Sequence, residues 1–399
     1  MAHFDPVSLA PADPILSLTE AFKADTNPRK INLSVGVFVN DSGTTPILPT
    51  VSEAERRLAN NTTTKSYLPI TGSPAYGALT QELCFGTEIK NSLNGRIISA
   101  QTPGGTGGLR VAADFIKTNL STNTVWLSNP TWANHKGIFS STGLETKTYA
   151  YFDKTSSGLN YEAFIESIKA IPPGDVVILH ACCHNPTGAD LSPAQWDEVA
   201  AIATEKNWIP LLDFAYQGFG EDLQTDAHGV RAFAQTGLPL FVAQSFSKNF
   251  GLYQDRVGAL HIITANDDEA KRVASRMKIA IRTNYSNPPA HGGGIVQTIL
   301  NDPDLYAQWE TEVTDMRKRI HRVRDDFVAA LAAAGVSRDF GFLKQQKGMF
   351  SFTGLDQEQA VALREKYSIY IVNDGRINVA GITSDNLPYL VQSLKLLLG

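Results

Sequence analysis

A lysine stands at the end of an apolar segment and among hydroxyl side chains, in the run Ser245-Phe246-Ser247-Lys248, and Arg256 follows shortly after. Hydroxyl groups and a guanidinium suit a phosphate monoester, and a neutral lysine amine can form a Schiff base with an aldehyde. The pattern therefore predicts a phosphorylated, aldehyde-bearing cofactor attached at Lys248. The alternative is a lysine in a surface turn.

A glycine-rich run at 102–108, Thr-Pro-Gly-Gly-Thr-Gly-Gly, precedes an amphipathic run at 109–120. Backbone N–H groups at the start of a helix point outward and bind phosphate. The run is not a Walker loop, because it lacks Gly-Lys-Ser/Thr, and Arg110 stands where a dinucleotide fingerprint needs its third glycine. It predicts a second part of a phosphate site, with a purely structural turn as the alternative.

Three polar residues complete the candidate chemistry. Asp213 follows the apolar segment 208–212, Tyr216 comes three residues later, and Asn185 lies in the run His-Asn-Pro-Thr-Gly at 184–188. In a pyridoxal site a carboxylate keeps the pyridine nitrogen protonated, which makes the ring an electron sink. Asn185 and Tyr216 could donate hydrogen bonds to the phenolate oxygen of the cofactor. The alternative for Asp213 is the cap of the next helix.

Two histidines, His180 and His184, flank an Ala-Cys-Cys run and could suggest a metal site. Four β-forming residues precede them, so we expect a strand here. On a strand the two side chains would stand about 13 Å apart, too far for one ion. We therefore predict no metal site and expect Cys182 and Cys183 to be core residues.

The elements that must position these residues follow an α/β alternation. Short apolar runs between about 95 and 260 are typical of buried parallel strands, and segments of helical length separate most of them. This predicts a doubly wound, mostly parallel sheet whose ligand lies beyond the carboxyl ends of the strands. The strands are expected at 97–98, 124–127, 176–179, 209–212 and 240–243, and helix starts at Asp13-Pro14, Ser73-Pro74 and Ser192-Pro193.

The pattern changes after residue 304 to one long, charged amphipathic helix at about 305–334. A strand at 348–353, a helix at 358–366, a strand at 369–372 and a final helix from 384 are expected to form a smaller α/β domain. We divide the chain into an N-terminal arm with part of the small domain (1–45), a large cofactor-binding domain (46–304), and the bridging helix with the rest of the small domain (305–399).

Composition sets the class of protein. The 399 residues are 43% hydrophobic and 19% charged, as in a soluble globular enzyme. A net charge of −5 without basic runs excludes a nucleic-acid or anionic-membrane partner, and no apolar stretch is long enough for a membrane span. The start of the chain does not resemble a signal peptide. Cys84, Cys182 and Cys183 suit a reducing compartment, so a cytoplasmic location is expected.

With these residues assembled, the chain resembles the class I aspartate and aromatic aminotransferases, which are fold type I pyridoxal-phosphate enzymes. The resemblance runs from Pro11 to Gly381. It implies an aminotransferase with pyridoxal 5'-phosphate as its cofactor. The motifs that match in order lie at 102–107, 129–132 (Asn-Pro-Thr-Trp), 182–188, 213–219, 247–252 and 284–289.

The resemblance also implies a role for each candidate residue. Lys248 would anchor the cofactor and then move the substrate proton, and His135 would support Asp213 from behind. Arg376 would bind the substrate α-carboxylate, with Gly36 nearby and Phe350 in the pocket wall. Trp132 and Asn185 would also contact the substrate. The remaining cofactor contacts would come from Gly105, Thr106, Ser245 and Arg256 at the phosphate, Trp132 on the ring face, and Asn185 and Tyr216 at the phenolate oxygen.

Family members are homodimers with shared sites, which implies two contributions from the other subunit. Tyr67 would reach the phosphate and Arg282 would bind the distal carboxylate of the substrate. The segment before Asp13 would cross to the neighbouring subunit. An isolated monomer would then have incomplete sites.

Aspartate and 2-oxoglutarate are the expected substrates, because Arg282 offers a second fixed cation. Val37, Thr45, Thr106 and Asn287 match the aspartate group, whereas Val39 replaces its usual lysine and Pro69 is shared with the aromatic group. An aromatic aminotransferase, with activity on phenylalanine or tyrosine, is therefore the alternative. A pyridoxal-dependent lyase and a non-catalytic ligand-sensing module of a transcription regulator are less favoured.

Overall fold

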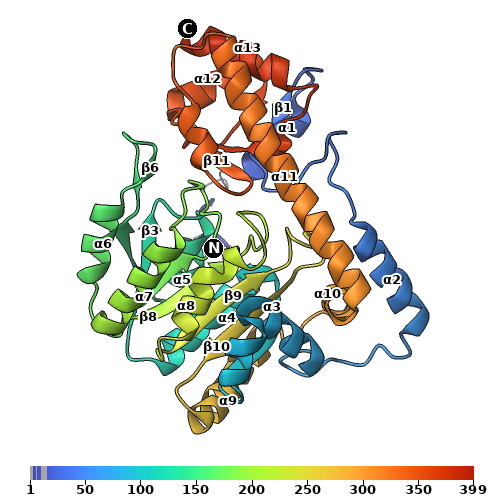
Figure 1. Cartoon of the computed structure of the whole chain (residues 1–399), viewed down its shortest axis with the longest axis vertical. Coiled ribbons are helices and arrows are strands. Elements are labelled where there is room, and N and C mark those ends of the chain that lie inside the picture. Colours follow the sequence, from blue (N-terminus) through green and yellow to red (C-terminus); the bar gives the residue numbers. More distant parts are fainter. Residues whose placement is uncertain (1–2, 6, 10–15) are drawn as a thin grey trace.

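The computed structural model describes residues 3–5, 7–9 and 16–399. Its centre is a seven-stranded sheet in the order β2-β10-β9-β8-β7-β3-β4 (Figure 1). The expected helix start at Asp13-Pro14 lies outside the described residues. The strands of this sheet are β2 (Ile97–Pro103), β3 (Thr124–Asn129), β4 (Glu145–Ala150), β7 (Val176–His180), β8 (Ile209–Phe214), β9 (Leu240–Ser245) and β10 (Val257–Ile263).

All five strands predicted for this sheet are present, and the predicted fold class is confirmed. Every residue of β7, β9 and β10 is buried, as expected for central strands with both faces covered. The sequence interpretation missed β4 and β10. Strand β10 is antiparallel to β2 and β9, whereas the other neighbouring strands are parallel. The sheet is therefore mixed, with one reversed strand.

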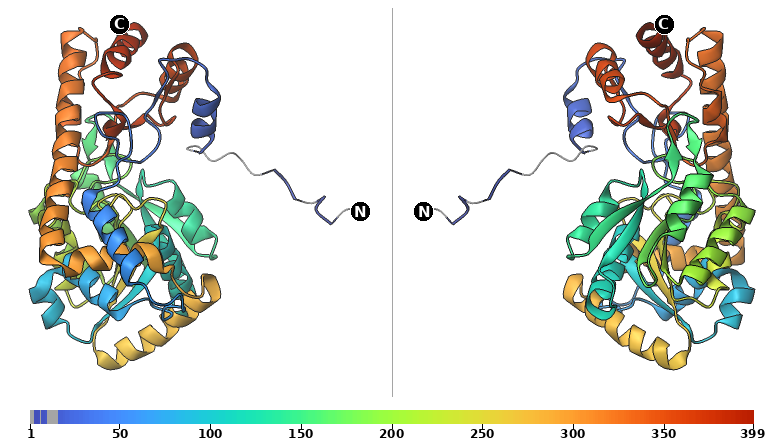
Figure 2. Two further views of the ribbon diagram at one scale, coloured as in Figure 1. Left: turned by 90° about the vertical axis from the view of Figure 1, so that its right-hand side faces the viewer. Right: turned by 90° about the vertical axis from the view of Figure 1, so that its left-hand side faces the viewer.

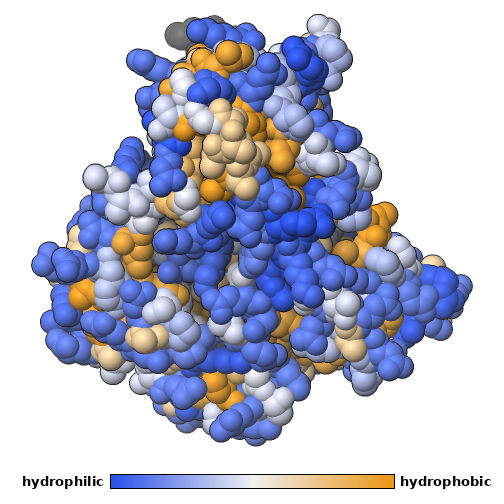
Figure 3. Space-filling view, turned by 45° about the horizontal axis from the view of Figure 1, so that its top comes forward, coloured by the Kyte–Doolittle hydropathy of each residue, from blue (hydrophilic) through white to orange (hydrophobic). Residues whose placement is uncertain are grey.

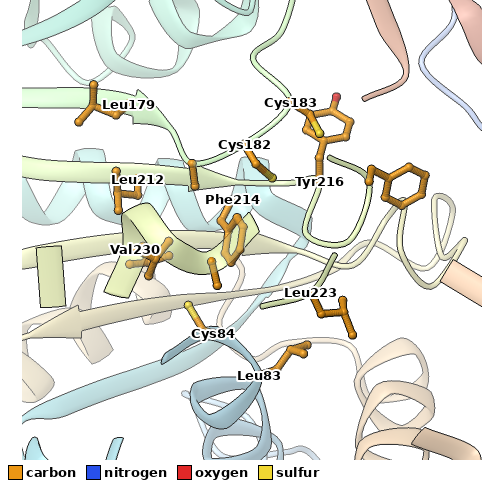
Figure 4. Packing of buried hydrophobic residues seen from close by; sticks show 14 of the residues in the cluster. Leu83, Cys84, Leu179, Cys182, Cys183, Leu212, Phe214, Tyr216, Leu223 and Val230 are labelled. Carbon is orange, nitrogen blue, oxygen red and sulfur yellow. The ribbon is translucent and has the colours of Figure 1, made fainter. Parts of the chain in front are cut away.

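Helices cover both faces of the sheet. On one face α4 (Gly104–Asn119), α5 (Asn134–Ser140) and α9 (Asp267–Asn284) enclose one hydrophobic cluster. On the other, α3 (Pro74–Ser92), α6 (Tyr161–Lys169), α7 (Pro193–Lys206) and α8 (His228–Ala234) enclose another. Figure 4 shows part of the second cluster, in which Cys84, Cys182 and Cys183 pack among leucines, Phe214 and Val230. The three cysteines are free and buried, so the prediction that Cys182 and Cys183 are core residues is confirmed.

The two predicted helix starts within the described residues are confirmed. The Ser73 hydroxyl accepts a hydrogen bond from the Tyr76 N–H at the start of α3, and proline follows at the first helical position. At α7 the Ser192 and Gln195 side chains form a capping box. Each cap satisfies backbone N–H groups that the helix cannot pair itself.

A long helix, α11 (Pro303–Ala333), runs from the large sheet to the far end of the molecule (Figures 1 and 2). The predicted helix at 305–334 is thus confirmed. Beside its upper end, β1 (Ile31–Asn32) pairs with β12 (Ile369–Tyr370), and β11 (Phe350–Phe352) pairs with β13 (Arg376–Asn378). Helices α1 (Leu16–Ala24), α12 (Gln357–Tyr367) and α13 (Leu387–Leu398) complete this part. The domain boundaries at 45 and 304 stay a prediction.

The surface in Figure 3 is mainly hydrophilic, and hydrophobic residues gather in a patch on its upper part. Among the described residues, no helix has the length and apolar character needed to cross a bilayer. Residues 3–5 and 7–9 lie away from the rest of the chain (Figure 2), with Phe4 and Leu9 exposed. The other elements are α2 (Pro49–Asn61), α10 (Ala290–Asn301), β5 (Phe152–Asp153), β6 (Gly158–Leu159) and the short 3₁₀ helices at 225–227, 341–345 and 379–381.

Candidate active site

A cavity of about 560 Å³ opens at the carboxyl ends of β7, β8 and β9, and residues of β11 and β13 also line it. Parallel strands end together at this edge, and α4 begins there, so short loops deliver polar residues from distant parts of the sequence to one place. The predicted site residues that line the cavity are Gly36, Gly105, Thr106, Trp132, Asn185, Asp213, Tyr216, Ser245, Lys248, Arg256, Phe350 and Arg376.

One end of the cavity has the properties of a phosphate site. Helix α4 begins there at Gly104, and Ser245 and Arg256 lie beside it. A Cβ on Gly104 would lie 2.6 Å from Arg256 Nη2, and a Cβ on Gly105 would lie 3.1 Å from Ser245 Cβ. Glycine at these positions lets backbone, hydroxyl and guanidinium approach closely. The free N–H groups of the helix start and the cation together suit the phosphate of pyridoxal phosphate.

A buried carboxylate lies on the cavity wall, at the end of β8. Asp213 Oδ2 lies 3.0 Å from His135 Nε2, and His135 Nδ1 lies 2.8 Å from the Thr131 hydroxyl. Burial opposes ionisation of Asp213, but the hydrogen bond and charge of His135 and the charge of Lys248 outweigh it and lower its pKa. His135 does not line the cavity and stands behind Asp213, where the resemblance places it. A buried anion here fits a protonated pyridine nitrogen.

Lys248 is a partly buried lysine that lines the cavity, with its Nζ 4.6 Å from the centre of the Tyr216 ring. Burial lowers its pKa to about 8, and the nearby cations Arg256 and Arg376 add to this effect while Asp213 opposes it. A lysine with such a pKa is partly neutral near pH 8. It can therefore act as a nucleophile and as a base.

Arg376, on β13, places a buried cation in the wall of the cavity. Its Nη1 donates to Asn185 Oδ1 at 3.1 Å, and its Nη2 donates to the Ser34 carbonyl at 2.8 Å. Its guanidinium carbon lies 4.1 Å from the centre of the Phe350 ring. Within the described part of the chain, its buried Nε has no hydrogen-bond partner. Such an unpaired donor is suited to a carboxylate of the substrate.

Comparison with known proteins agrees with this geometry. Residues 28–394 match the family model "Aminotransferase class I and II". The chain belongs to this family. It is 51% identical to the aspartate aminotransferase of Escherichia coli over 98% of this chain and 99% of that protein. Its identity to a tyrosine aminotransferase of Klebsiella pneumoniae is 43%, over 98% of both chains.

A solved structure extends the likeness to the whole fold. The aromatic-amino-acid aminotransferase of Burkholderia pseudomallei, covalently bound to pyridoxal phosphate, superposes with a TM-score of 0.97 at 46% identity and covers 100% of both chains. The resemblance stated from the sequence is thereby confirmed. The fold type I assignment is confirmed as well.

The histidines of this aminotransferase require a correction. Strand β7 ends at His180, and the chain then turns at Cys183, where φ is +50°. The rings of His180 and His184 are consequently 4.2 Å apart between centroids, not the predicted distance of about 13 Å. His180, His135 and Asp213 each present a possible ligand atom, all within 4.8 Å of one another. The predicted separation of the two histidines was therefore wrong, and the absence of a metal stays a prediction.

Besides His135, two predicted residues, Tyr67 and Arg282, do not line the cavity of this aminotransferase chain. Tyr67 is 92% exposed. Arg282 is exposed in the last turn of α9, and its Nη1 donates to the Ser286 hydroxyl. Both were expected to serve the site of a partner subunit, which stays a prediction.

Sequence reasoning also missed several residues of the cavity. Ser247 had a signal, because it stands in the same hydroxyl-rich run as Lys248. Tyr253 had none, and its hydroxyl accepts a hydrogen bond of 2.8 Å from the N–H of Phe38. The remaining lining residues are Val35, Leu109, His180 and Ala215.

Proposed function

We propose that this aminotransferase moves the amino group of aspartate to 2-oxoglutarate with pyridoxal 5'-phosphate as its cofactor. The observation that carries the proposal is one cavity lined by a partly buried lysine, a buried carboxylate and a buried arginine whose Nε has no hydrogen-bond partner among the described residues. The similarity to aspartate aminotransferases over nearly the whole chain supports the same reaction.

The cofactor would be held by residues from several loops. When bound, pyridoxal phosphate supplies an electron sink for the carbanion at the substrate α-carbon. Asp213 would keep the pyridine nitrogen protonated, and Trp132 would cover the ring face. Asn185 and Tyr216 would donate to the phenolate oxygen. The phosphate would contact Gly105, Thr106, Ser245 and Arg256.

Lys248 would have two successive roles. Its amine would hold the cofactor through a Schiff base, and substrate binding would release it. The freed amine would then move the proton from the substrate α-carbon to the cofactor, as a general base and acid. The burial that lowers its pKa to about 8 supplies the neutral amine that both roles need.

The pH dependence of cofactor binding tests this role of Lys248. Only the neutral amine attacks the aldehyde, so we expect recombination of the apoprotein with pyridoxal phosphate to accelerate as pH rises, with a midpoint near 8. An unperturbed lysine would give a midpoint near 10.4. Stopped-flow absorbance from pH 6 to 11 measures the rate, and free butylamine with the same aldehyde is the control. A midpoint above 10 would contradict the proposed environment.

Substrate choice rests on two cations. Arg376, with Gly36 and Phe350 around it, would bind the α-carboxylate that every amino-acid substrate carries. Arg282 would bind the side-chain carboxylate of aspartate or glutamate. The tyrosine and aromatic-amino-acid aminotransferases at 42–43% identity, together with Val39 and Pro69, favour aromatic amino acids as secondary substrates.

The enzyme would act in the cytoplasm as a homodimer with shared active sites. The exposed positions of Tyr67 and Arg282 support sharing, because neither reaches the cavity of its own chain. The exposed apolar residues Phe4, Val7 and Leu9 suit a segment that packs on a neighbour. The free cysteines are compatible with a reducing compartment.

A hybrid dimer tests the shared site. We expect a dimer of one Lys248→Ala subunit and one Arg282→Ala subunit to regain about half of the wild-type activity on aspartate per dimer, because one of its two sites would contain both intact residues. Differently tagged subunits are co-expressed and purified through both tags. Oxaloacetate formation is compared with that of each parent homodimer.

The same assay includes its own controls. A hybrid of Lys248→Ala with wild type also contains one intact site, so it sets the activity that the test hybrid should reach. No recovery in a verified hybrid would mean that each site is built from one chain. Formation of CO2 or an elimination product in place of oxaloacetate would favour a lyase.

A further inference from the structure

We infer that Asp190, which is partly buried, and Asp226, which is buried, are positioning residues whose carboxylates hold the loops carrying Asn185 and Tyr216. Neither carboxylate lines the cavity, so neither touches the reacting atoms. The inference rests on the roles proposed above for Asn185 and Tyr216. It assigns a function to a cluster of charges that the proposed chemistry does not use.

Asp190 holds the loop between β7 and α7. Its two carboxylate oxygens accept hydrogen bonds from the backbone N–H groups of Cys183 at 2.6 Å and His184 at 2.8 Å. Cys183 has a φ of +50°, a conformation that costs a non-glycine residue free energy. The two hydrogen bonds offset this cost and fix the direction in which the chain continues. Asn185 follows His184 directly, and its side-chain oxygen accepts a hydrogen bond from Arg376.

Asp226 holds the turn after β8 in a similar way. Its carboxylate accepts hydrogen bonds from the N–H groups of Gly218 at 2.8 Å, Gly220 at 2.9 Å and Glu221 at 2.9 Å. A Cβ on Gly220 would lie only 2.5 Å from Asp226 Oδ1, so the turn closes tightly around the carboxylate. Tyr216 precedes this turn and shares a backbone hydrogen bond with it.

The two carboxylates belong to one cluster. Both line a small cavity of about 30 Å³, together with Glu221 and Lys347. Burial raises the pKa of Asp226 to about 7 against the effect of its hydrogen bonds, and the charge of Asp190 adds to this rise. Burial also raises the pKa of Asp190, while Lys347 opposes the rise.

Lys347 connects the two loops. Its backbone N–H donates to the Gly188 carbonyl at 2.7 Å, on the Asn185 loop. Its Nζ pairs with the Glu221 carboxylate, on the Tyr216 loop. The cluster therefore links both loops to the segment that leads into Phe350 in the cavity wall.

This arrangement matters because Asn185 and Tyr216 would reach the same oxygen of the cofactor from different loops. Hydrogen bonds weaken steeply as distance and angle depart from their optimum, so a small movement of either loop would weaken one donor. Weaker donors stabilise the anionic phenolate oxygen of the cofactor less. They would therefore raise the pKa of the bound cofactor, which is the chromophore of the holoenzyme. A residue that only supports the fold would leave that pKa unchanged.

The test uses the holoenzyme with Asp190→Asn and Asp226→Asn. Each variant keeps the size of the side chain but replaces one acceptor by a donor that faces a backbone N–H. We expect the acid dissociation constant of the bound chromophore, measured from its visible absorption against pH, to fall about three- to tenfold. Cofactor content should stay the same, and kcat for aspartate should fall more than KM changes.

The matched control is Asp222→Asn. Asp222 also accepts two backbone hydrogen bonds, from Gln224 at 2.7 Å and Thr225 at 2.6 Å, but it is exposed. Its variant should titrate like wild type. If Asp190→Asn or Asp226→Asn fails to fold, Lys347→Met serves instead, because it removes only the charge that connects the loops. It should lower the acid dissociation constant of the chromophore by a smaller factor.

Reference variants separate the two ways of failing. If Asn185→Ala and Tyr216→Phe shift the chromophore while Asp190→Asn, Asp226→Asn and Lys347→Met leave it unchanged, the inference is wrong and the proposed roles stand. If Asn185→Ala and Tyr216→Phe also leave it unchanged, those roles are wrong and the inference falls with them. Shifts in both groups, with Asp222→Asn unchanged, support it.

Discussion

Replacement of Lys248 by alanine is expected to leave a folded protein whose transamination rate falls by more than about 10² to 10⁴-fold. That range is typical for loss of a general base alone, and loss of the covalent anchor adds to it. The cavity residues that would hold the phosphate and the pyridine nitrogen remain, so the variant should still bind pyridoxal phosphate without a covalent bond.

Lys248→Arg is the control for charge and volume. Arginine keeps a cation in the cavity, but its pKa above about 12 leaves almost no neutral form to attack the aldehyde or accept a proton. It should therefore be as inactive as Lys248→Ala. Oxaloacetate formation from aspartate, far-UV circular dichroism and cofactor content are measured for both. Turnover near the wild-type rate in either variant would contradict the assignment of Lys248.

The main parts of the site could be predicted because several of its polar residues lie at or just after the carboxyl ends of apolar strands. Asp213 is the last residue but one of β8, Ser245 is the last residue of β9, and Lys248 follows β9 closely. The carboxyl ends of parallel strands meet at one edge, so local apolar runs were sufficient to bring these residues together. Arg376, far away in the chain, had no such signal, and only the family resemblance placed it at the site.

Other features could not be predicted because they depend on contacts that a local pattern does not encode. An apolar run does not show whether a strand is parallel, and β10 is antiparallel to both neighbours. His184 comes close to His180 because the backbone of Cys183 is in the left-handed region. A glycine would have indicated such a turn, but the sequence has a cysteine there. Asp190 and Asp226 had no signal as supports of the site, since their partners are backbone N–H groups of distant loops.

The two substrate-binding arginines are expected to have separable effects. Every amino-acid substrate has an α-carboxylate, so Arg376→Ala should lower kcat/KM for aspartate and phenylalanine alike. A hydrogen bond to a charged group contributes about 1.5 to 3 kcal/mol, and loss of two such bonds corresponds to a fall of roughly 10² to 10⁴-fold. Among the described residues the buried Nε of Arg376 has no hydrogen-bond partner, which suits an arginine that binds a carboxylate.

Arg282→Ala should instead lower kcat/KM for aspartate by about ten- to 150-fold and spare phenylalanine, because only a dicarboxylic substrate uses the second cation. Arg282→Asp should begin to favour cationic amino acids. Arg276→Ala, which removes another exposed arginine from α9, is the control for the loss of positive charge. Single-turnover half-reactions with aspartate, glutamate, tyrosine and phenylalanine give the ratios. Equal losses for aspartate and phenylalanine in Arg282→Ala would show that Arg282 supports the structure and does not select the substrate side chain.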